Sequence, residues 1–467
     1  MVCRQERVVE MEADRATKRA AAIVAAVAAF LTPFMGSSVN VALPVIGAEF
    51  ALNTMLLSWV PSSFLLSAAM FLVPCGRLAD IYGRKKIFFA GAAVYTLFSL
   101  LSGLAPSGAA LIAFRFLQGI GGAMIFGTGV AILTSVYPPR ERGKALGINV
   151  AAVYTGLSLG PFAGGLLTHY TGWRSVFLAN VPLGLLVLAL VWLKLKGEWA
   201  EAKGEAFDFP GAAIYALLLV ALMYGFSALP GPVGYILVVL GLAGGVAFAL
   251  WEARTASPLL DVSLFRKNRV FALSNLAALI HYSATFAVGF LLSLYLQYIK
   301  GFTPDGAGTV LVAQPAVMAL LSPFAGRLSD VIEPRVVASL GMGMTAAGLL
   351  MLTFLVPDTS LGLILAALLL LGLGFALFSS PNTNAVMGAV EKRYYGVASG
   401  ILGTMRLVGQ MLSMGLVMLI FALYLGKAHI RPANYHLFLA GVRTAFAVFG
   451  VLCALGVFAS LARGNVR

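Results

Sequence analysis

The sequence predicts an all-α polytopic membrane protein, and three observations lead to that prediction. The chain of 467 residues is 60% hydrophobic with a mean hydropathy of +0.94, which is too apolar for a soluble globular protein. Apolar runs of about 20 residues recur along nearly its whole length, and each is long enough to cross roughly 30 Å of hydrocarbon as a helix. The alternating strands of about ten residues that a membrane β-barrel uses are absent from the sequence.

Fourteen apolar runs are expected to be spans, because each is bounded by a polar or turn-forming segment. The run after the mixed-charge tail 1–19 has no A-x-A-like cleavage site, so we expect it to be retained as the first span. The predicted ranges are 20–44, 56–78, 87–105, 108–136, 145–170, 173–195, 209–229, 233–252, 271–297, 306–327, 335–356, 360–381, 396–425 and 438–461.

Basic residues alternate between the two sides of this predicted array. Loops such as "GRKK", "PPRERGK" and "RKNR" lie on the side of the N-terminal tail and hold most of the 32 Lys and Arg residues. The positive-inside rule then places both termini in the cytoplasm, which requires an even number of spans. The net charge of +14 is therefore expected to reflect membrane topology and not nucleic-acid binding.

Two short motifs occur twice. "GRLAD" at 76–80 is echoed by "GRLSD" at 326–330, and "RGKALGI" at 142–148 by the weaker match "YGVASGI" at 395–401. The equivalent helices are eight apart, so a duplicated six-helix unit is interrupted by two extra spans. The expected organisation is a cytoplasmic N-tail (1–19), an N-terminal bundle (20–195), a cytoplasmic linker (196–208), two inserted helices (209–252), a cytoplasmic loop (253–270), a C-terminal bundle (271–461) and a cytoplasmic C-tail (462–467).

Several motifs in order along the chain resemble those of one transporter family. "GRLADIYGRKK" (76–86) resembles the loop 2–3 motif of the major facilitator superfamily, and "RFLQGIGG" (115–122) its helix-4 motif. "GLSLGPFAGG" (156–165) is similar to the antiporter motif of helix 5. "SSVNVALP" (37–44) and "WRSVFLANVPLG" (173–184) are similar to segments of the fourteen-helix drug:proton antiporter branch.

This resemblance implies a fold and a function. It implies the major facilitator fold, with two pseudo-symmetric bundles around a central cavity and 6+2+6 helices. It also implies a secondary active transporter in the plasma membrane that exports drug-like amphipathic small molecules by alternating access, driven by protons and functional as a monomer. An exporter of an endogenous metabolite, or of an anionic or lipid-like molecule with different or no proton coupling, is the alternative.

The loop 2–3 motif is expected to latch the two bundles as well as to anchor the chain. The resemblance places Asp80 beside the start of helix 13 near Gly396, where a helix N-terminus favours a carboxylate. The plain alternative is a positive-inside anchor. The candidate latch residues are Gly76, Asp80, Gly83, Arg84, Lys85 and the pseudo-symmetric Asp330.

The helix-5 motif places glycines on one helical face. Gly156, Gly160 and Gly164 recur at every fourth residue, which lets a neighbouring backbone approach closely. Pro161 removes a backbone hydrogen bond and bends the helix. With Gly165, these residues form the candidate antiporter motif, which favours export, although small residues at this spacing also occur in ordinary helix packing.

Polar residues inside the predicted spans are candidates for the substrate and proton pathway. Arg115 and Arg406 are costly in a membrane and normally face water or a partner, and all eighteen acidic residues lie in tails, loops or helix ends. That balance favours neutral or anionic substrates over permanent cations. Met35 stands where the branch commonly has an aspartate, so His281 is the titratable candidate for a proton carrier. Helix packing is the alternative role for the others, which are Asn40, Gln118, Tyr154, Tyr282 and Tyr295.

Other classes of protein are disfavoured. Cys3, Cys75 and Cys453 show no metal-ligand spacing, so neither a disulfide framework nor a metal site is expected. The four histidines form no cluster with acidic residues, so no enzyme active site and no cofactor are predicted. The expected partners are a small-molecule substrate, protons and the lipid bilayer.

Overall fold

The chain folds into long, roughly parallel helices. The computed structural model describes residues 2–137, 142–255, 258–260, 265–266, 268–391, 395–426 and 428–464, and it contains no strand in these ranges. Fourteen helical segments of this described part are long and apolar enough to cross a membrane, which confirms the predicted number of spans. The chain is therefore a multi-pass membrane protein.

Six of the spans form the N-terminal half. The sixth span is interrupted after residue 178. The elements are α1 (Val2–Glu49), α2 (Thr54–Tyr82), α3 (Arg84–Gly103), α4 (Gly108–Val136), α5 (Arg142–Thr171), α6 (Arg174–Leu178) and α7 (Asn180–Lys194).

Six more spans form the C-terminal half, and four of them contain several elements. The elements are α11 (Arg269–Thr285), α12 (Val288–Leu294), the π-helix η1 (Tyr295–Ile299), α13 (Pro304–Leu311), α14 (Ala313–Val331), α15 (Pro334–Met351), the 3-10 helix η2 (Leu352–Phe354), α16 (Leu361–Gly388), α17 (Tyr395–Tyr424), the 3-10 helix η4 (Pro432–Asn434) and α18 (Tyr435–Ala462).

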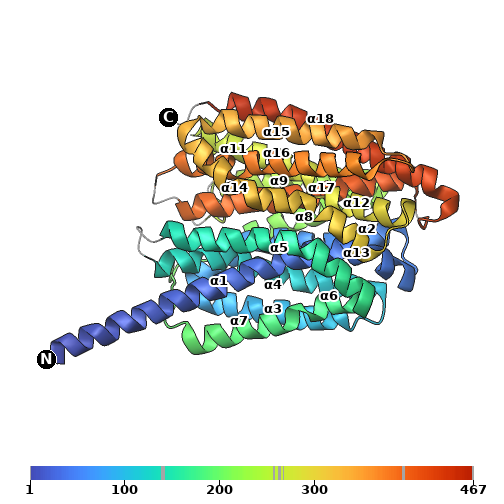
Figure 1. Ribbon diagram of the computed structural model, residues 1–467. Coiled ribbons are helices and arrows are strands. Elements are labelled where there is room, and N and C mark those ends of the chain that lie inside the picture. The colour runs from blue at the N-terminus through green and yellow to red at the C-terminus, as the bar shows by residue number, and fades with distance from the viewer. Residues whose placement is uncertain are drawn as a thin grey trace.

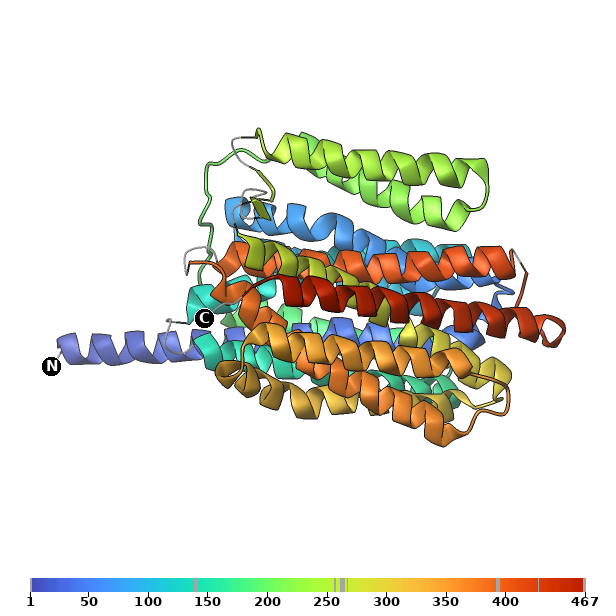
Figure 2. The ribbon, with the colours of Figure 1, turned by 90° about the horizontal axis from the view of Figure 1, so that it is seen from above.

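The two remaining spans are the inserted pair. Helices α8 (Phe209–Ala228) and α9 (Pro232–Glu252) pack on each other, and α8 also contacts α2 and α17. Figure 2 shows the pair, in green, standing at one edge of the molecule, outside the other helices. The two halves and the peripheral pair agree with the predicted fold class.

Both chain ends lie at the same end of the helices (Figure 1). In that view α1, α3 and α5 belong to one half and α14, α15 and α18 to the other. We call this end the terminal face and the other end the opposite face. Loop 2–3 lies at the terminal face, since α2 and α3 meet there, and the α5–α6 and α12–α13 connections lie at the opposite face.

Polar side chains fix where several helices begin. In each case an oxygen of the residue before the helix accepts a hydrogen bond from a backbone N–H of the first turn, which satisfies one of the four free donors there. These N-caps are Asn53 of α2, Ser107 of α4, Asp208 of α8, Asn268 of α11 and Ser360 of α16.

The two largest boundary errors are at the start of the first helix and at the end of the twelfth. The first helix begins at Val2 instead of residue 20, because the mixed-charge segment contains no Gly or Pro to end it. The twelfth span continues to Gly388 instead of ending at Pro381, which membrane helices tolerate in their interior. The predicted ninth and tenth helices are each interrupted, at Phe286–Ala287 and at Val312.

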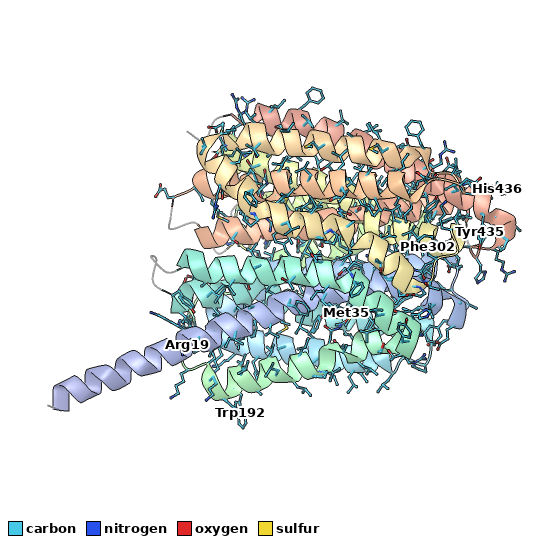
Figure 3. All side chains as sticks on the ribbon, in the orientation of Figure 1. Arg19, Met35, Trp192, Phe302, Tyr435 and His436 are labelled. Carbon is cyan, nitrogen blue, oxygen red and sulfur yellow. The ribbon has the colours of Figure 1, made fainter. Side chains whose placement is uncertain are left out.

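The outer and inner surfaces of the helices differ as a membrane protein requires. Figure 3 shows Trp192 pointing away from the helices, and this side chain is 76% exposed. Met35 lies among them and is fully buried, with Asn180 Nδ2 3.9 Å from its sulfur. The position at which the family branch commonly carries an aspartate is thus part of the apolar core of the N-terminal half.

Candidate functional site

The loop 2–3 motif forms a tight turn around one arginine. Gly83 joins α2 to α3 with φ of +119°, a conformation that side chains with a Cβ rarely adopt. Arg84, only 8% exposed, follows it and donates to Asp80 Oδ1 from Nε (2.9 Å) and from Nη2 (2.8 Å). Its Nη1 donates to Glu201 Oε1 at 2.8 Å and to Ser135 Oγ of α4.

The acidic linker covers this turn, which was not predicted. The Ala202 N–H donates to Asp80 O at 2.9 Å and the Arg84 N–H to Trp199 O at 2.8 Å, so the linker backbone binds both sides of Gly83. The Lys85 N–H donates to the carboxylate of Glu198. Three glutamates in 196–208 opposite the basic run of 77–86 were the sequence signal for this contact.

The predicted partner of Asp80, the start of α17 near Gly396, adjoins residues that the structure does not describe. Residues 392–394 lie outside the described residues, as do the side chains of Tyr395, where α17 begins, and of Asp330, and nothing is described of the surroundings of Gly396. Helices α2 and α17 nevertheless pack along each other, since a Cβ at Gly403 would lie 3.7 Å from Leu72. No Cβ contact would form at Gly76. The latch stays a prediction.

The glycines of the helix-5 motif pack against α1. A Cβ at Gly156 would lie 2.5 Å from Phe30 O, and one at Gly164 would lie 2.6 Å from Ser38 Cα. At Gly160 the approach is close enough for Ser38 Oγ to donate to its carbonyl oxygen at 2.8 Å. These three residues therefore hold two helices of the same half at backbone contact.

The same motif has a second face, which contacts the other half. A Cβ at Gly165 would lie 2.6 Å from Pro304 O, and Gly308 packs on the carbonyl oxygen of Pro161. Both contacts join α5 to α13, near the opposite face. The G-P-x-x-G-G motif is thus a joint between the halves as well as a packing motif within one of them.

Polar contacts strengthen this joint. Ser293 Oγ donates to Asn40 O at 2.7 Å, and Gln297 Nε2 donates to Val41 O at 2.9 Å, which ties α12 and η1 to α1. His169 Nδ1 of α5 lies 3.4 Å from Asp305 Oδ1 of α13. These contacts close the two halves on each other toward the opposite face. Sequence reasoning missed the His169–Asp305 pair because no motif links two residues so far apart.

Arg115 is enclosed within the N-terminal half. It is 1% exposed, its Nη1 donates to Gln118 Oε1, and its Nε lies 3.4 Å from Val60 O. Its guanidinium carbon lies 4.4 Å from the ring centroid of Phe64, so an aromatic face adds to the polar contacts. Gln118 Nε2 in turn donates a hydrogen bond to Ser99 Oγ of α3. The structure brings the predicted pair Arg115 and Gln118 together, but away from the interface of the halves.

His281 and Tyr295 lie inside the C-terminal half. The His281 ring is fully buried and stacks on Phe378, with ring centroids 4.0 Å apart. Its Nδ1 lies 3.9 Å from Cys453 Sγ. Tyr295 donates its hydroxyl to Val356 O at 2.6 Å. Both residues therefore occupy packed positions, and His281 also packs on Phe375 and Tyr282, with ring centroids 5.1 Å and 6.0 Å away.

Arg406, Tyr282 and Tyr154 meet where the halves contact. Arg406 Nη2 of α17 donates to Thr383 Oγ1 of α16 at 2.7 Å, and its guanidinium carbon lies 5.7 Å from the Tyr282 ring centroid. Tyr282 of α11 packs in one cluster with Met318 and Phe375, and Tyr154 of α5 packs against this cluster from the other half. Tyr282 thus links Arg406 to the cluster that Tyr154 contacts, and His281 packs on the same cluster. Among the described residues, no group of three His, Cys, Asp or Glu side chains could hold a metal ion.

Comparisons with known proteins agree with the motifs. The profile of the Major Facilitator Superfamily matches residues 25–251 and 274–465. The chain is 35% identical over 402 residues to "Multidrug resistance protein Stp" of Mycobacterium tuberculosis (strain CDC 1551 / Oshkosh), covering 84% of this chain and 74% of that protein. It is 36% identical to "Cephamycin export protein CmcT" of Amycolatopsis lactamdurans, over 84% and 83% of the two chains.

A third relative is named for a vitamin. "Riboflavin transporter RibZ" of Clostridioides difficile (strain 630) is 30% identical, over 82% of this chain and 84% of that protein. Among solved structures, a crystal structure of peptide transporter POT in complex with sulfate superposes with a TM-score of 0.69 at 16% identity, covering 95% and 96% of the two chains. At that identity the likeness shows the fold alone.

Proposed function

Because this chain belongs to the major facilitator superfamily, we propose that it is a secondary active transporter that exports amphipathic, drug-like small molecules by alternating access, driven by the proton gradient. The observation that carries the proposal is the joint at Pro161–Gly165, where the antiporter motif of one half meets α13 of the other at backbone contact. A contact of this kind between two rigid halves is what an alternating-access cycle must make and break.

The relatives support export and leave the substrate class open. Two of the three relatives described above carry names that refer to multidrug resistance or to cephamycin export. The third is named as a riboflavin transporter, which favours the alternative that this chain exports an endogenous metabolite. Since substrate does not follow from fold, both substrate classes belong in the test.

The charge pattern supports an orientation with the terminal face in the cytoplasm of a cell whose plasma membrane holds the protein. The basic loop 76–86 and most other Lys and Arg residues lie at the terminal face. In that orientation the joint closes the extracellular side, and the state described is closed to the outside. We propose that the monomer is the functional unit, because each chain contains both halves.

Transport by the purified full chain in proteoliposomes tests this function. With an acidic lumen and the cytoplasmic loops facing the external medium, radiolabelled riboflavin should accumulate inside, and ethidium should accumulate less because it is a permanent cation. A protonophore should abolish the accumulation. Protein-free liposomes with the same pH gradient are the control. Accumulation that is unaffected by the protonophore would contradict proton coupling, and no accumulation of any amphipathic probe would contradict export.

A further inference from the structure

Two arginines lie at membrane depth, and the structure separates their roles. The Arg115 guanidinium has several partners inside one half: it donates to Gln118 and to a carbonyl oxygen, and it lies over the Phe64 ring. Arg406 donates one hydrogen bond, to Thr383 Oγ1, and its Nε is shielded from solvent with no hydrogen-bond partner among the described residues. Arg406 is the eleventh residue beyond Tyr395, about 16 Å along α17 from its start.

The position of Arg406 is set by a close helix contact. Gly409, one turn further along α17, lets this helix approach α11, since a Cβ there would lie 2.7 Å from Leu279 O and 2.9 Å from Tyr282 Cβ. Residues three apart share a helical face, so Arg406 is directed to the Tyr282 side of α17. Tyr282 in turn belongs to the cluster that Tyr154 reaches from the other half. The guanidinium therefore lies beside an aromatic cluster at the contact between the halves.

In the ranges that the structure describes, no carboxylate balances this charge at that depth. All eighteen Asp and Glu residues lie in tails, loops or helix ends, and a single hydroxyl does not neutralise a guanidinium. The planar fork of an arginine matches a carboxylate, which accepts two parallel hydrogen bonds from it. An unused donor, an unbalanced charge and an adjacent apolar cluster together are the features of a site for an amphipathic anion.

We propose that Arg406, held by Thr383 and Tyr282, is the anion-binding subsite of the transporter. It takes the carboxylate of an amphipathic aryl or alkyl acid, whose apolar body packs on Tyr154, Met318 and Phe375. The inference rests on the proposed function, because it names the substrate class that the exporter carries. A bound substrate would contact both halves, since Tyr154 comes from one half and Met318 and Phe375 from the other.

Binding of two matched probes to the full chain in lipid nanodiscs tests the subsite. 1-Pyrenebutyrate and its methyl ester differ in the carboxylate and share the apolar body. Arg406→Gln should weaken pyrenebutyrate binding roughly tenfold or more, the usual loss for hydrogen bonds to a charged group, and should leave ester binding within about twofold. Arg443→Gln, which removes the same charge from an exposed position near the opposite face, should change neither affinity.

The ester also reports whether the variant is folded. If Arg406→Gln binds neither probe, Thr383→Val is the variant to test, since it keeps the shape of the side chain and removes the hydroxyl that holds the guanidinium. Thr383→Val should weaken pyrenebutyrate binding about threefold or more and leave ester binding unchanged. Equal affinities of wild-type protein for the two probes, or equal losses of both probes in Thr383→Val, would overturn the subsite. Export by the same variants in proteoliposomes separates the two proposals. Unchanged pyrenebutyrate binding by Arg406→Gln with intact riboflavin export defeats the subsite alone, whereas wild-type protein that exports neither riboflavin nor pyrenebutyrate defeats the proposed function.

Discussion

Gly165 offers a way to perturb the joint between the halves without altering either half. Its Cα faces α13, and a Cβ added there would lie 2.6 Å from Pro304 O and 2.9 Å from Asp305 Cα. Both are backbone atoms, which cannot move aside as a flexible side chain can. Gly165→Ala should therefore destabilise the state that is closed at the opposite face by about 1–3 kcal/mol, the usual cost of overpacking.

That penalty translates into a change of population. If the halves separate there during the cycle, the open state does not contain the clash, so the equilibrium shifts toward it by roughly 5- to 150-fold. Gly164→Ala is the matched control, because a Cβ at Gly164 would lie 2.6 Å from Ser38 Cα of α1, in the same half. It should lower thermal stability without changing which face is open.

Distances between spin labels measure this shift. Labels on cysteines at Ala109 and Asp358, both exposed at the opposite face and in different halves, would be placed in a chain whose three native cysteines are alanine. Gly165→Ala should populate the longer distance, and Gly164→Ala should give the wild-type distribution. Identical distributions for all three proteins would show that this joint does not open, and the alternating-access reasoning from it would be wrong.

Two further perturbations test charges at the two faces. Asp80→Asn removes a carboxylate partner of Arg84 and should strongly reduce uptake into proteoliposomes while the protein is expressed at the normal level. Asp330→Asn should reduce uptake less, because its loop "DVIEPR" lacks the basic run of loop 2–3. Full activity in both variants would contradict the latch. The His169–Asp305 contact joins α5 to α13 near the opposite face, so Asp305→Asn should weaken closure there and move the spin-label populations toward the longer distance. The side chains are 37% and 31% exposed, so the populations should change only about two- to fivefold, and His169→Gln should give a shift in the same direction. Wild-type distributions in both variants would show that this pair does not help to close the opposite face.

The spans and their number were determined by the sequence, because a helix satisfies its backbone hydrogen bonds internally wherever an apolar run is long enough. Local signals also determined the turn at Gly83 and the close approach at Gly156, Gly160 and Gly164, since a positive φ or a missing Cβ depends on one residue and its immediate neighbours. The length of α1 was predictable in principle, because nothing in the tail ends a helix.

Only the tertiary structure decided what the polar residues contact. Arg115 and Arg406 look alike in sequence, yet one is enclosed by α2, α3 and α4 while the other lies at the contact between the halves. Arg84 meets Glu201 across 117 residues of sequence, and His169 meets Asp305 between halves. Such contacts depend on how each helix is rotated and which helix lies beside it, and a hydrophobic period of 3.6 residues does not specify these in a membrane, where lipid is as apolar as the helix faces.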